Sequence, residues 1–345
     1  MAISNTTING AKPAASSGFT IPISDSDRLA GTTSPATVQK GVETYHRDGI
    51  VALTNAVDPE IAKALNEKMV ADTEEYIKRS DAHWNQGKAA RNISQVPPLQ
   101  KEWIHQQIWA NPHAMVILEN LLGPQPELHF VNSNIALSNP NPNARQAVHS
   151  DAYFDHPHFP WCMVVNIYLS EVNAQRGVTE IWPGTHTSTK ADHLAPHHGW
   201  IQRHKFVERA KVSPPVQPSL PAGTVVIRDM RIWHAGMPNL TPDPRIMLTF
   251  VYFPKYYRNP MKIKLPLSVR STVNSWPMVD FEAGTEWVDD GIDYLGLQFQ
   301  ANWTQTEAGL VAGGANGVTS GGKEDVEVLE PTVQRENYWV AGDVE

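Results

Sequence analysis

The chain has 345 residues, of which 41% are hydrophobic, and it carries a formal net charge of −8. This length accommodates one large domain or two small ones, and the apolar content suffices for a sizeable core. The 28 Lys and Arg residues are scattered. Because nucleic acids and acidic membranes bind clustered positive charge, we expect no partner of either kind.

Neither a disulfide framework nor a membrane anchor is indicated. Cys162 is the only cysteine, which excludes an intramolecular disulfide and is typical of a reducing compartment. No apolar run is long enough to span a bilayer, and the polar residues 1–10 contain no hydrophobic signal region. We therefore expect a cytoplasmic protein.

The chain begins with a predicted arm that leads into helices. Residues 1–36 are rich in Ser, Thr, Ala and Gly and lack periodicity, which predicts a flexible N-terminal arm. A first element over residues 38–48 is followed by a strand-like run at 49–53. Asp58-Pro59 then supplies an N-cap and a proline at the first helical position, so a helix to about Arg79 is predicted.

A second helical region follows a polar interval. It covers residues 101–122 and ends at Gly123-Pro124. The polar residues 81–98 between the two helical regions predict a long loop.

Short apolar or alternating runs replace the helices from Glu127 onward. They cover residues 128–137, 162–169, 178–182, 224–227 and 246–253. Gly, Pro and Asn separate them, which is typical of an antiparallel β sandwich or barrel. Helices first and strands afterwards predict a mainly β fold with an N-terminal helical layer packed on a β core.

The pattern weakens after Pro254. Residues 309–322 are Gly-rich and residues 323–330 are acidic, which predicts a linker and a solvated segment. We therefore predict one domain over residues 37–300, followed by a C-terminal extension over residues 301–345.

His149-X-Asp151 and His234 are candidate metal ligands. On an extended segment, residues two apart point the same way, so His149 and Asp151 can reach one ion. His234 follows a turn and a strand at residues 221–229 and would come from a separate rigid element. Two imidazoles and one carboxylate can hold Fe(II) on one face and leave positions open for a cosubstrate and O2. Alone, so short a motif is more often a surface His and Asp in a polar loop.

Arg245 begins the next apolar strand and is a candidate site for an acidic cosubstrate. A guanidinium binds a carboxylate with two parallel hydrogen bonds, as a dicarboxylic keto acid requires. Taken alone, a salt-bridged surface arginine is the simpler interpretation.

Several segments occur together in a fixed order: YHRDGIV at residues 45–51, His149-X-Asp151, GVTEIWPGTH at 177–186, PAGT at 221–224, HAGMPN at 234–239, and Arg245. This set resembles the phytanoyl-CoA dioxygenase (PhyH) family, which are Fe(II)/2-oxoglutarate-dependent oxygenases. The resemblance covers roughly residues 38–255 and is greatest to fungal members that tailor small natural products. It implies a double-stranded β-helix core, that is, a jelly-roll or cupin-like fold.

The resemblance also implies a role for each matching residue. The catalytic iron ligands would be His149, Asp151 and His234. Arg245 would bind the distal carboxylate of 2-oxoglutarate with help from the hydroxyl of Thr179. Gln146 matches a position beside the cosubstrate in the fungal relatives, and Asn92 is loosely matched to a further amide there.

The implied protein is a non-haem Fe(II)/2-oxoglutarate-dependent dioxygenase of secondary metabolism. It would use O2 to hydroxylate, desaturate or rearrange a small organic molecule at a C–H bond, with release of succinate and CO2. Asp151 favours oxygenation over halogenation, because halogenating relatives replace that carboxylate with a small residue. Two alternatives stay open: a cupin-like metalloenzyme that does not use 2-oxoglutarate, and a non-catalytic binding module on the same fold.

The expected partner is a small apolar or aromatic substrate. Four aromatic residues follow Asp151 closely and either line its pocket or pack the core beneath it, namely Tyr153, Phe154, Phe159 and Trp161. The negative net charge disfavours a CoA thioester. The resemblance to the fungal members is also consistent with a homodimer.

Overall fold

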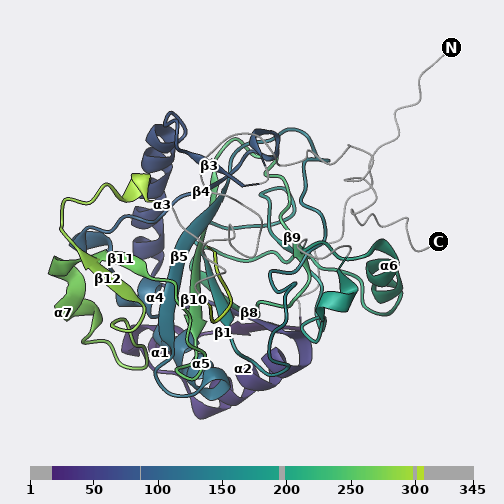
Figure 1. Ribbon diagram of the computed structural model, residues 1–345, viewed down its shortest axis with the longest axis horizontal. Helices are drawn as coiled ribbons and strands as arrows, with labels where there is room; N and C mark the ends of the chain where they lie inside the picture. Colours follow the sequence, from purple (N-terminus) through teal and green to yellow (C-terminus); the bar gives the residue numbers. More distant parts are fainter. Residues whose placement is uncertain (1–17, 86, 194–198, 298–300, 307–345) are drawn as a thin grey trace.

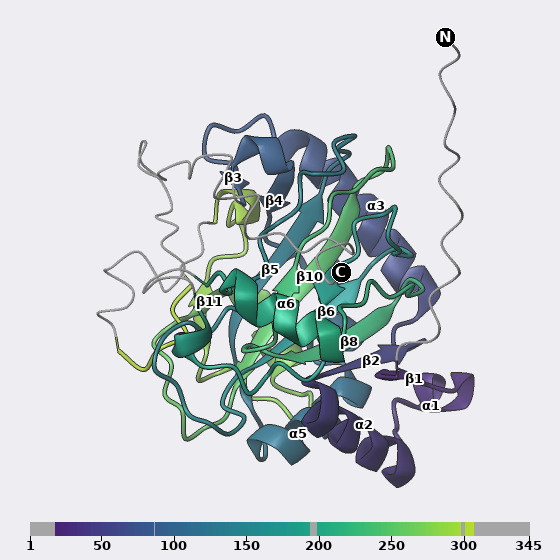
Figure 2. The same cartoon turned by 90° about the vertical axis from the view of Figure 1, so that its right-hand side faces the viewer.

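The computed structural model of the protein describes residues 18–85, 87–193, 199–297 and 301–306. A twisted sheet runs through its centre, with α3 (Pro59–Tyr76) on one side and α6 (Arg203–Val212) on the other (Figure 1). Figure 2 views the sheet from the side of α6, with α3 behind it. The remaining helices are α1 (Asp25–Ala30), α2 (Pro35–Asp48), α4 (Gln106–Trp109), α5 (Pro112–Leu122) and α7 (Arg270–Val273).

The central sheet has eight strands. Their spatial order is β1 (Thr20–Pro22), β2 (Ile50–Thr54), β8 (Thr224–Asp229), β6 (Met163–Tyr168), β10 (Arg245–Phe253), β5 (Glu127–Ala136), β4 (Asn92–Ser94) and β3 (His83–Trp84). The pair β1–β2 is parallel, and the other neighbours are antiparallel. The five strand segments predicted from Glu127 onward correspond to β5, β6, β8, β10 and the short strand β7 (Glu180–Ile181).

The two faces of the central sheet bury different residues, because successive strand side chains alternate. Along β10, one face contributes Ile246, Leu248, Phe250 and Tyr252 to a core shared with the helices. The other face contributes Met247, Thr249 and Val251 to the wall of a cavity. The helical layer therefore packs on one face of the sheet, and the opposite face forms the wall of a site.

A smaller layer closes the cavity on that opposite face. Strand β7 pairs with β9 (His234–Ala235) in an antiparallel ladder, and isolated bridges join His149 to His234 and Ile181 to Val216. A further parallel pair, β11 (Ile263–Pro266) with β12 (Thr285–Val288), follows β10 in the chain. The prediction of a mainly β fold with a helical layer is confirmed.

The predicted start of a helix after Asp58 is confirmed by its cap, and two further helices begin in the same way. The side chains of Ser34, Asp58 and Asn111 accept hydrogen bonds from backbone N–H groups of α2, α3 and α5, and a proline follows each of them. The helical region predicted over residues 101–122 is divided at Ala110 and Asn111 into α4 and α5.

Three boundaries differ from the sequence predictions. The flexible arm predicted for residues 1–36 is wrong for the described residues 18–36, because Phe19 and Ile21 are buried and β1 pairs with β2. The loop predicted for residues 81–98 contains β3 and β4 at the sheet edge. Trp303, assigned to the extension, packs on Phe130 of the domain. The Gly-rich and acidic segments, residues 309–330, lie outside the described residues.

In the described part of the chain, no helix has both the length and the apolar character needed to cross a membrane.

Replacement of Ile21 by Ala tests whether β1 is part of the core. Ile21 is 3% exposed, so I21A is expected to lower the free energy of unfolding by about 2–5 kcal/mol in urea denaturation. The matched control is L29A in α1, where the side chain is 76% exposed and the expected change is within about 0.5 kcal/mol. Equal effects of the two variants would contradict the assignment of residues 18–23 to the fold.

Candidate metal centre

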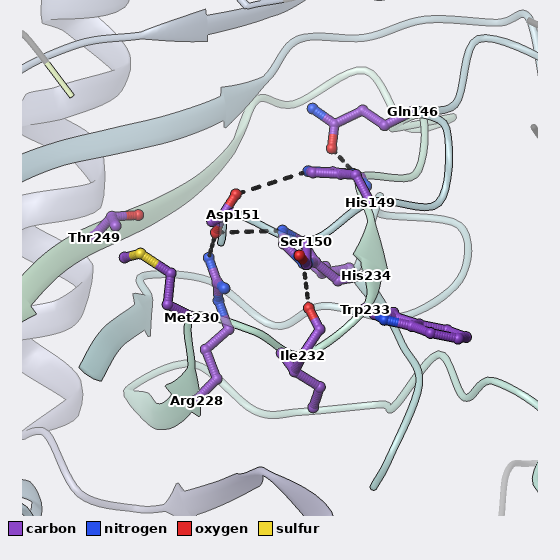
Figure 3. Close-up of polar contacts among 12 residues, drawn as sticks. Gln146, His149, Ser150, Asp151, Arg228, Met230, Ile232, Trp233, His234 and Thr249 are labelled. Carbon is purple, nitrogen blue, oxygen red and sulfur yellow. Dashed lines mark hydrogen bonds and ion pairs between the residues drawn. The ribbon is translucent and has the colours of Figure 1, made fainter. Parts of the chain in front are cut away.

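The three predicted metal ligands meet at one point. One ligand atom each from His149, Asp151 and His234 lies within 4.8 Å of the other two. The two carboxylate oxygens of Asp151 approach different imidazoles: Oδ1 is 4.0 Å from His149 Nε2, and Oδ2 is 3.8 Å from His234 Nε2 (Figure 3). Among the described residues, no other His, Cys, Asp and Glu side chains converge in this way.

A backbone bridge holds the two histidines opposite each other. The N–H of His149 donates to the carbonyl of His234 at 3.0 Å, and the N–H of His234 donates to the carbonyl of His149 at 2.8 Å. Their rings consequently lie 4.2 Å apart between centroids. Asp151 N–H donates to Met230 O at 3.2 Å, which fixes the third ligand against the same loop.

Each imidazole presents its Nε2 towards the carboxylate. The Nδ1 of His149 lies 2.8 Å from the carbonyl of Ala147, and the Nδ1 of His234 lies 3.0 Å from the carbonyl of Ile232. A carbonyl can only accept, so Nδ1 carries the proton and Nε2 keeps its lone pair. This arrangement orients both rings for metal binding.

The buried setting keeps the ligands in their metal-binding protonation states. Burial, followed by His149 and Arg228, lowers the pKa of His234 to about 3, and burial lowers the pKa of His149. Burial alone would raise the pKa of Asp151, but the imidazoles and Arg228 bring it to about 2. At neutral pH the cluster therefore offers two neutral nitrogens and one carboxylate, the donor set that suits Fe(II).

Arg228 is a site residue that the sequence analysis missed. Its Nη2 donates to Asp151 Oδ2 at 2.9 Å, and its Nε donates to Asn166 Oδ1 at 3.2 Å. This guanidinium fixes the orientation of the Asp151 carboxylate (Figure 3). Arg228 stands out in the sequence as a cation directly after the apolar residues of β8, but the sequence alone does not indicate which residue it pairs with.

A second buried ion pair supports the turn that delivers His234. Arg231 binds Asp229 through Nε at 2.8 Å and Nη2 at 2.7 Å, and Tyr45 of α2 donates to the same carboxylate. Arg231 Nη1 also donates to the carbonyl of His158 at 2.9 Å. These contacts join the turn to a helix and to the loop after Asp151.

Arg245 is a fully buried cation without a counter-ion among the described residues. It is 0% exposed, and its Nη1 donates to the backbone oxygen and Oδ1 of Asn134 at 3.0 and 3.1 Å. Its Nε and Nη2 have no hydrogen-bond partner in that part of the chain. Burial lowers the pKa of its guanidinium. Because an uncompensated buried charge is costly, these two groups fit a carboxylate ligand.

The structure places the other predicted cosubstrate residues in different positions. Thr179 lines the cavity and accepts a hydrogen bond from Tyr168 at 3.3 Å. Gln146 also lines it, and its Oε1 accepts from Gly236 N–H at 2.8 Å. A Cβ at Gly236 would lie 2.7 Å from that oxygen, so the glycine permits this close approach. Asn92 is not among the lining residues and donates to Asn134 Oδ1 at 3.1 Å, beside Arg245.

The aromatic walls of the cavity are not the predicted ones. None of the four residues proposed after Asp151 lines it: Trp161 is buried in a core cluster, and Phe159 is 55% exposed. The cavity is instead lined by Phe19, Phe130, Tyr168 and Trp303, which come from the residue before β1, from β5, from β6 and from the end of the described chain. His156 stacks on Trp161, and His197 and His198 lie outside the described residues.

The family is decided by a comparison with family models. The model of the phytanoyl-CoA dioxygenase (PhyH) family matches residues 45–247. The chain belongs to this family. The resemblance that the sequence motifs indicated is thereby confirmed.

A curated relative is similar over part of its length. Dioxygenase af480 of Aspergillus fumigatus (strain ATCC MYA-4609 / CBS 101355 / FGSC A1100 / Af293) is 27% identical over 188 residues, which cover 52% of this chain and 54% of that protein. This chain therefore matches about half the length of that relative.

Solved structures share the fold. The epimerase SnoN, in complex with Fe3+, alpha ketoglutarate and nogalamycin RO, has a TM-score of 0.51 and 20% identity, over 64% of this chain and 85% of that chain. EctD from S. alaskensis with bound Fe has a TM-score of 0.51 and 19% identity, over 66% and 79%. The predicted jelly-roll core of a PhyH protein is thereby confirmed.

Replacement of Arg231 by Met tests the support of the His234 turn. R231M leaves the Asp229 carboxylate buried without its cation, so we expect a loss of about 3–5 kcal/mol in the free energy of unfolding. The matched control is R270M, which breaks the exposed pair with Glu282 and should change the free energy of unfolding far less. Chemical denaturation of both variants measures the difference, and a loss no larger in R231M would refute the supporting role.

Proposed function

We propose that this PhyH protein is a non-haem Fe(II)/2-oxoglutarate-dependent dioxygenase that oxidises a C–H bond of a small organic molecule. One observation carries the proposal. A His-Asp-His cluster suited to Fe(II) lines the cavity, and a buried guanidinium that has no counter-ion among the described residues is bound to Asn134, another lining residue of the same cavity. The first is a donor set for the metal, and the second is a site for the distal carboxylate of the cosubstrate.

The iron would be held by His149, Asp151 and His234. Their contacts fit this role, because the protonated Nδ1 atoms are engaged by backbone carbonyls and Nε2 stays available. Arg228 holds the Asp151 carboxylate in place. Asp151 also favours oxygenation over halogenation, since it retains the carboxylate that halogenating relatives lack.

The cosubstrate would be held by Arg245 at its distal carboxylate. Thr179, with the neighbouring Tyr168 hydroxyl, and Gln146 would contribute polar groups from the cavity wall. Asn92 would act on Arg245 through Asn134 rather than touch the cosubstrate. When bound, Fe(II) and 2-oxoglutarate supply O2 activation coupled to formation of succinate and CO2, and the protein supplies ligands, orientation and a cavity with limited water.

The unpaired Arg245 distinguishes this proposal from its alternatives. A cupin-like metalloenzyme that does not use 2-oxoglutarate needs the three ligands but has no use for a buried cation without a counter-ion. A non-catalytic module does not require a complete ligand set. We include a small-molecule substrate in the proposal. The apolar or aromatic character of that substrate, a cytoplasmic location and a homodimer remain predictions from the sequence.

Removal of a ligand should abolish turnover. With Fe(II), ascorbate and a substrate found by screening, D151A and H234A are expected to reduce succinate formation from 2-oxoglutarate to background, because two ligands hold the metal too weakly. H204A, which changes an exposed histidine of α6, should keep the wild-type rate. Full turnover in D151A would exclude the assignment.

Replacement of Arg245 by Met should change the choice of keto acid. We expect R245M to bind 2-oxoglutarate about 100-fold more weakly, or about 3 kcal/mol, because the distal carboxylate loses its charged hydrogen bonds. Binding of 2-oxopentanoate, which has the same carbon chain without the distal carboxylate, should not fall. Calorimetric titration of the metal-loaded protein measures both, and an unchanged affinity for 2-oxoglutarate would favour the cupin-like alternative.

A further inference from the structure

Three polar side chains form one row across the cavity face of the central sheet. Thr249 of β10 is paired in register with Asn132 of β5 on one side and with Asn166 of β6 on the other. All three line the cavity. Two asparagines therefore occupy equivalent positions on either side of one threonine, in the same cavity.

The two asparagines differ in their hydrogen bonding. Asn166 Nδ2 donates to Leu248 O at 3.2 Å and to the Thr249 hydroxyl at 2.9 Å, and its Oδ1 accepts from Arg228 at 3.2 Å. Asn132 is only 5% exposed, yet its buried Oδ1 has no hydrogen-bond partner among the described residues. Asn166 is thus part of the protein's own network, whereas Asn132 is not.

An unpaired buried carboxamide oxygen destabilises the folded protein. Its loss of hydration is not compensated, and an apolar side chain of similar shape would cost nothing of this kind. Such a group in a cavity wall is explained when a ligand supplies the missing hydrogen bond. Asn132 is therefore a candidate for contact with a bound molecule.

The surroundings of Asn132 indicate which molecule. Its polar neighbours in the cavity wall are Thr249 and Asn134, and the wall beside them contains the apolar Phe130, Val251 and Trp303. The described arginine in this wall, Arg228, already pairs with Asp151. Within the described lining, no lysine or second arginine could neutralise a phosphate or a carboxylate beside Asn132.

We propose that Asn132 is a specificity-determining residue whose Oδ1 accepts a hydrogen bond from an uncharged donor of the substrate, such as a hydroxyl or an amide N–H, while the apolar neighbours hold the body of the substrate. This inference rests on the proposed function and names the substrate class of that site. A site built to pair with a polar group rejects analogues that lack it, because the protein group is then left unpaired.

The first experiment compares N132L with N166L in the protein without metal. Leucine has a similar shape to asparagine, so N132L should keep or raise the thermal unfolding midpoint, whereas N166L should lower it by removing paired hydrogen bonds. A lower midpoint in N132L would overturn the proposal, because it would mean that the folded protein already pairs this amide.

The second experiment measures binding of benzamide and toluene to the protein loaded with Fe(II) and 2-oxoglutarate without O2. N132L should bind benzamide at least about tenfold more weakly than the wild type, a loss of one hydrogen bond, and should bind toluene at least as well. No benzamide binding to the wild type, or equal binding to both, would refute the proposal. Failure of the wild type to bind 2-oxoglutarate would instead refute the proposed function, and it would leave the stability comparison intact.

Discussion

The site depends on the antiparallel backbone bridge between His149 and His234. This bridge places two imidazoles from distant parts of the chain side by side, and Asp151 follows within two residues of one of them. The orientation of both imidazole rings is fixed by this bridge and by the hydrogen bonds from their Nδ1 atoms to the carbonyls of Ala147 and Ile232. The candidate metal site of this PhyH protein is therefore positioned mainly by backbone geometry.

Three of four arginines around this bridge pair with a carboxylate, and one does not. Arg228 pairs with Asp151, Arg231 with Asp229, and Arg145 with Glu180. The first and third of these pairs join segments that are distant in sequence, the second lies within one turn, and all three leave little charge uncompensated. Arg245 alone among these four arginines has no carboxylate partner in the described residues, although it is the most buried. Because the other three arginines are paired, the lack of a carboxylate partner for Arg245 in the described residues indicates a functional role.

The sequence predicted those site residues that local motifs identify. The spacing of His149 and Asp151 and the strand before His234 predicted three residues that do converge, and the predicted cation Arg245 is bound to Asn134, which lines the same cavity. It could not find Arg228, whose contact with Asp151 depends on the register of β8 against β6. For the same reason, the difference between Asn132 and Asn166 is invisible without the cross-strand pairing.

Proximity in sequence was a poor guide to the cavity wall. The aromatic residues after Asp151 turn into the core or to the surface, and the wall is completed by Phe19 and Trp303 from opposite ends of the described chain. Phe19 was missed because its buried place depends on pairing with β2, a tertiary contact that leaves no local period in residues 18–23.

The central claim is that the metal ligands and Arg245 form one site for Fe(II) and 2-oxoglutarate. The most direct measurement is anaerobic visible spectroscopy of the Fe(II)-loaded protein during titration with 2-oxoglutarate. The account predicts a weak charge-transfer band that saturates with the cosubstrate. Binding of one equivalent of iron without any such band at saturating 2-oxoglutarate would contradict it.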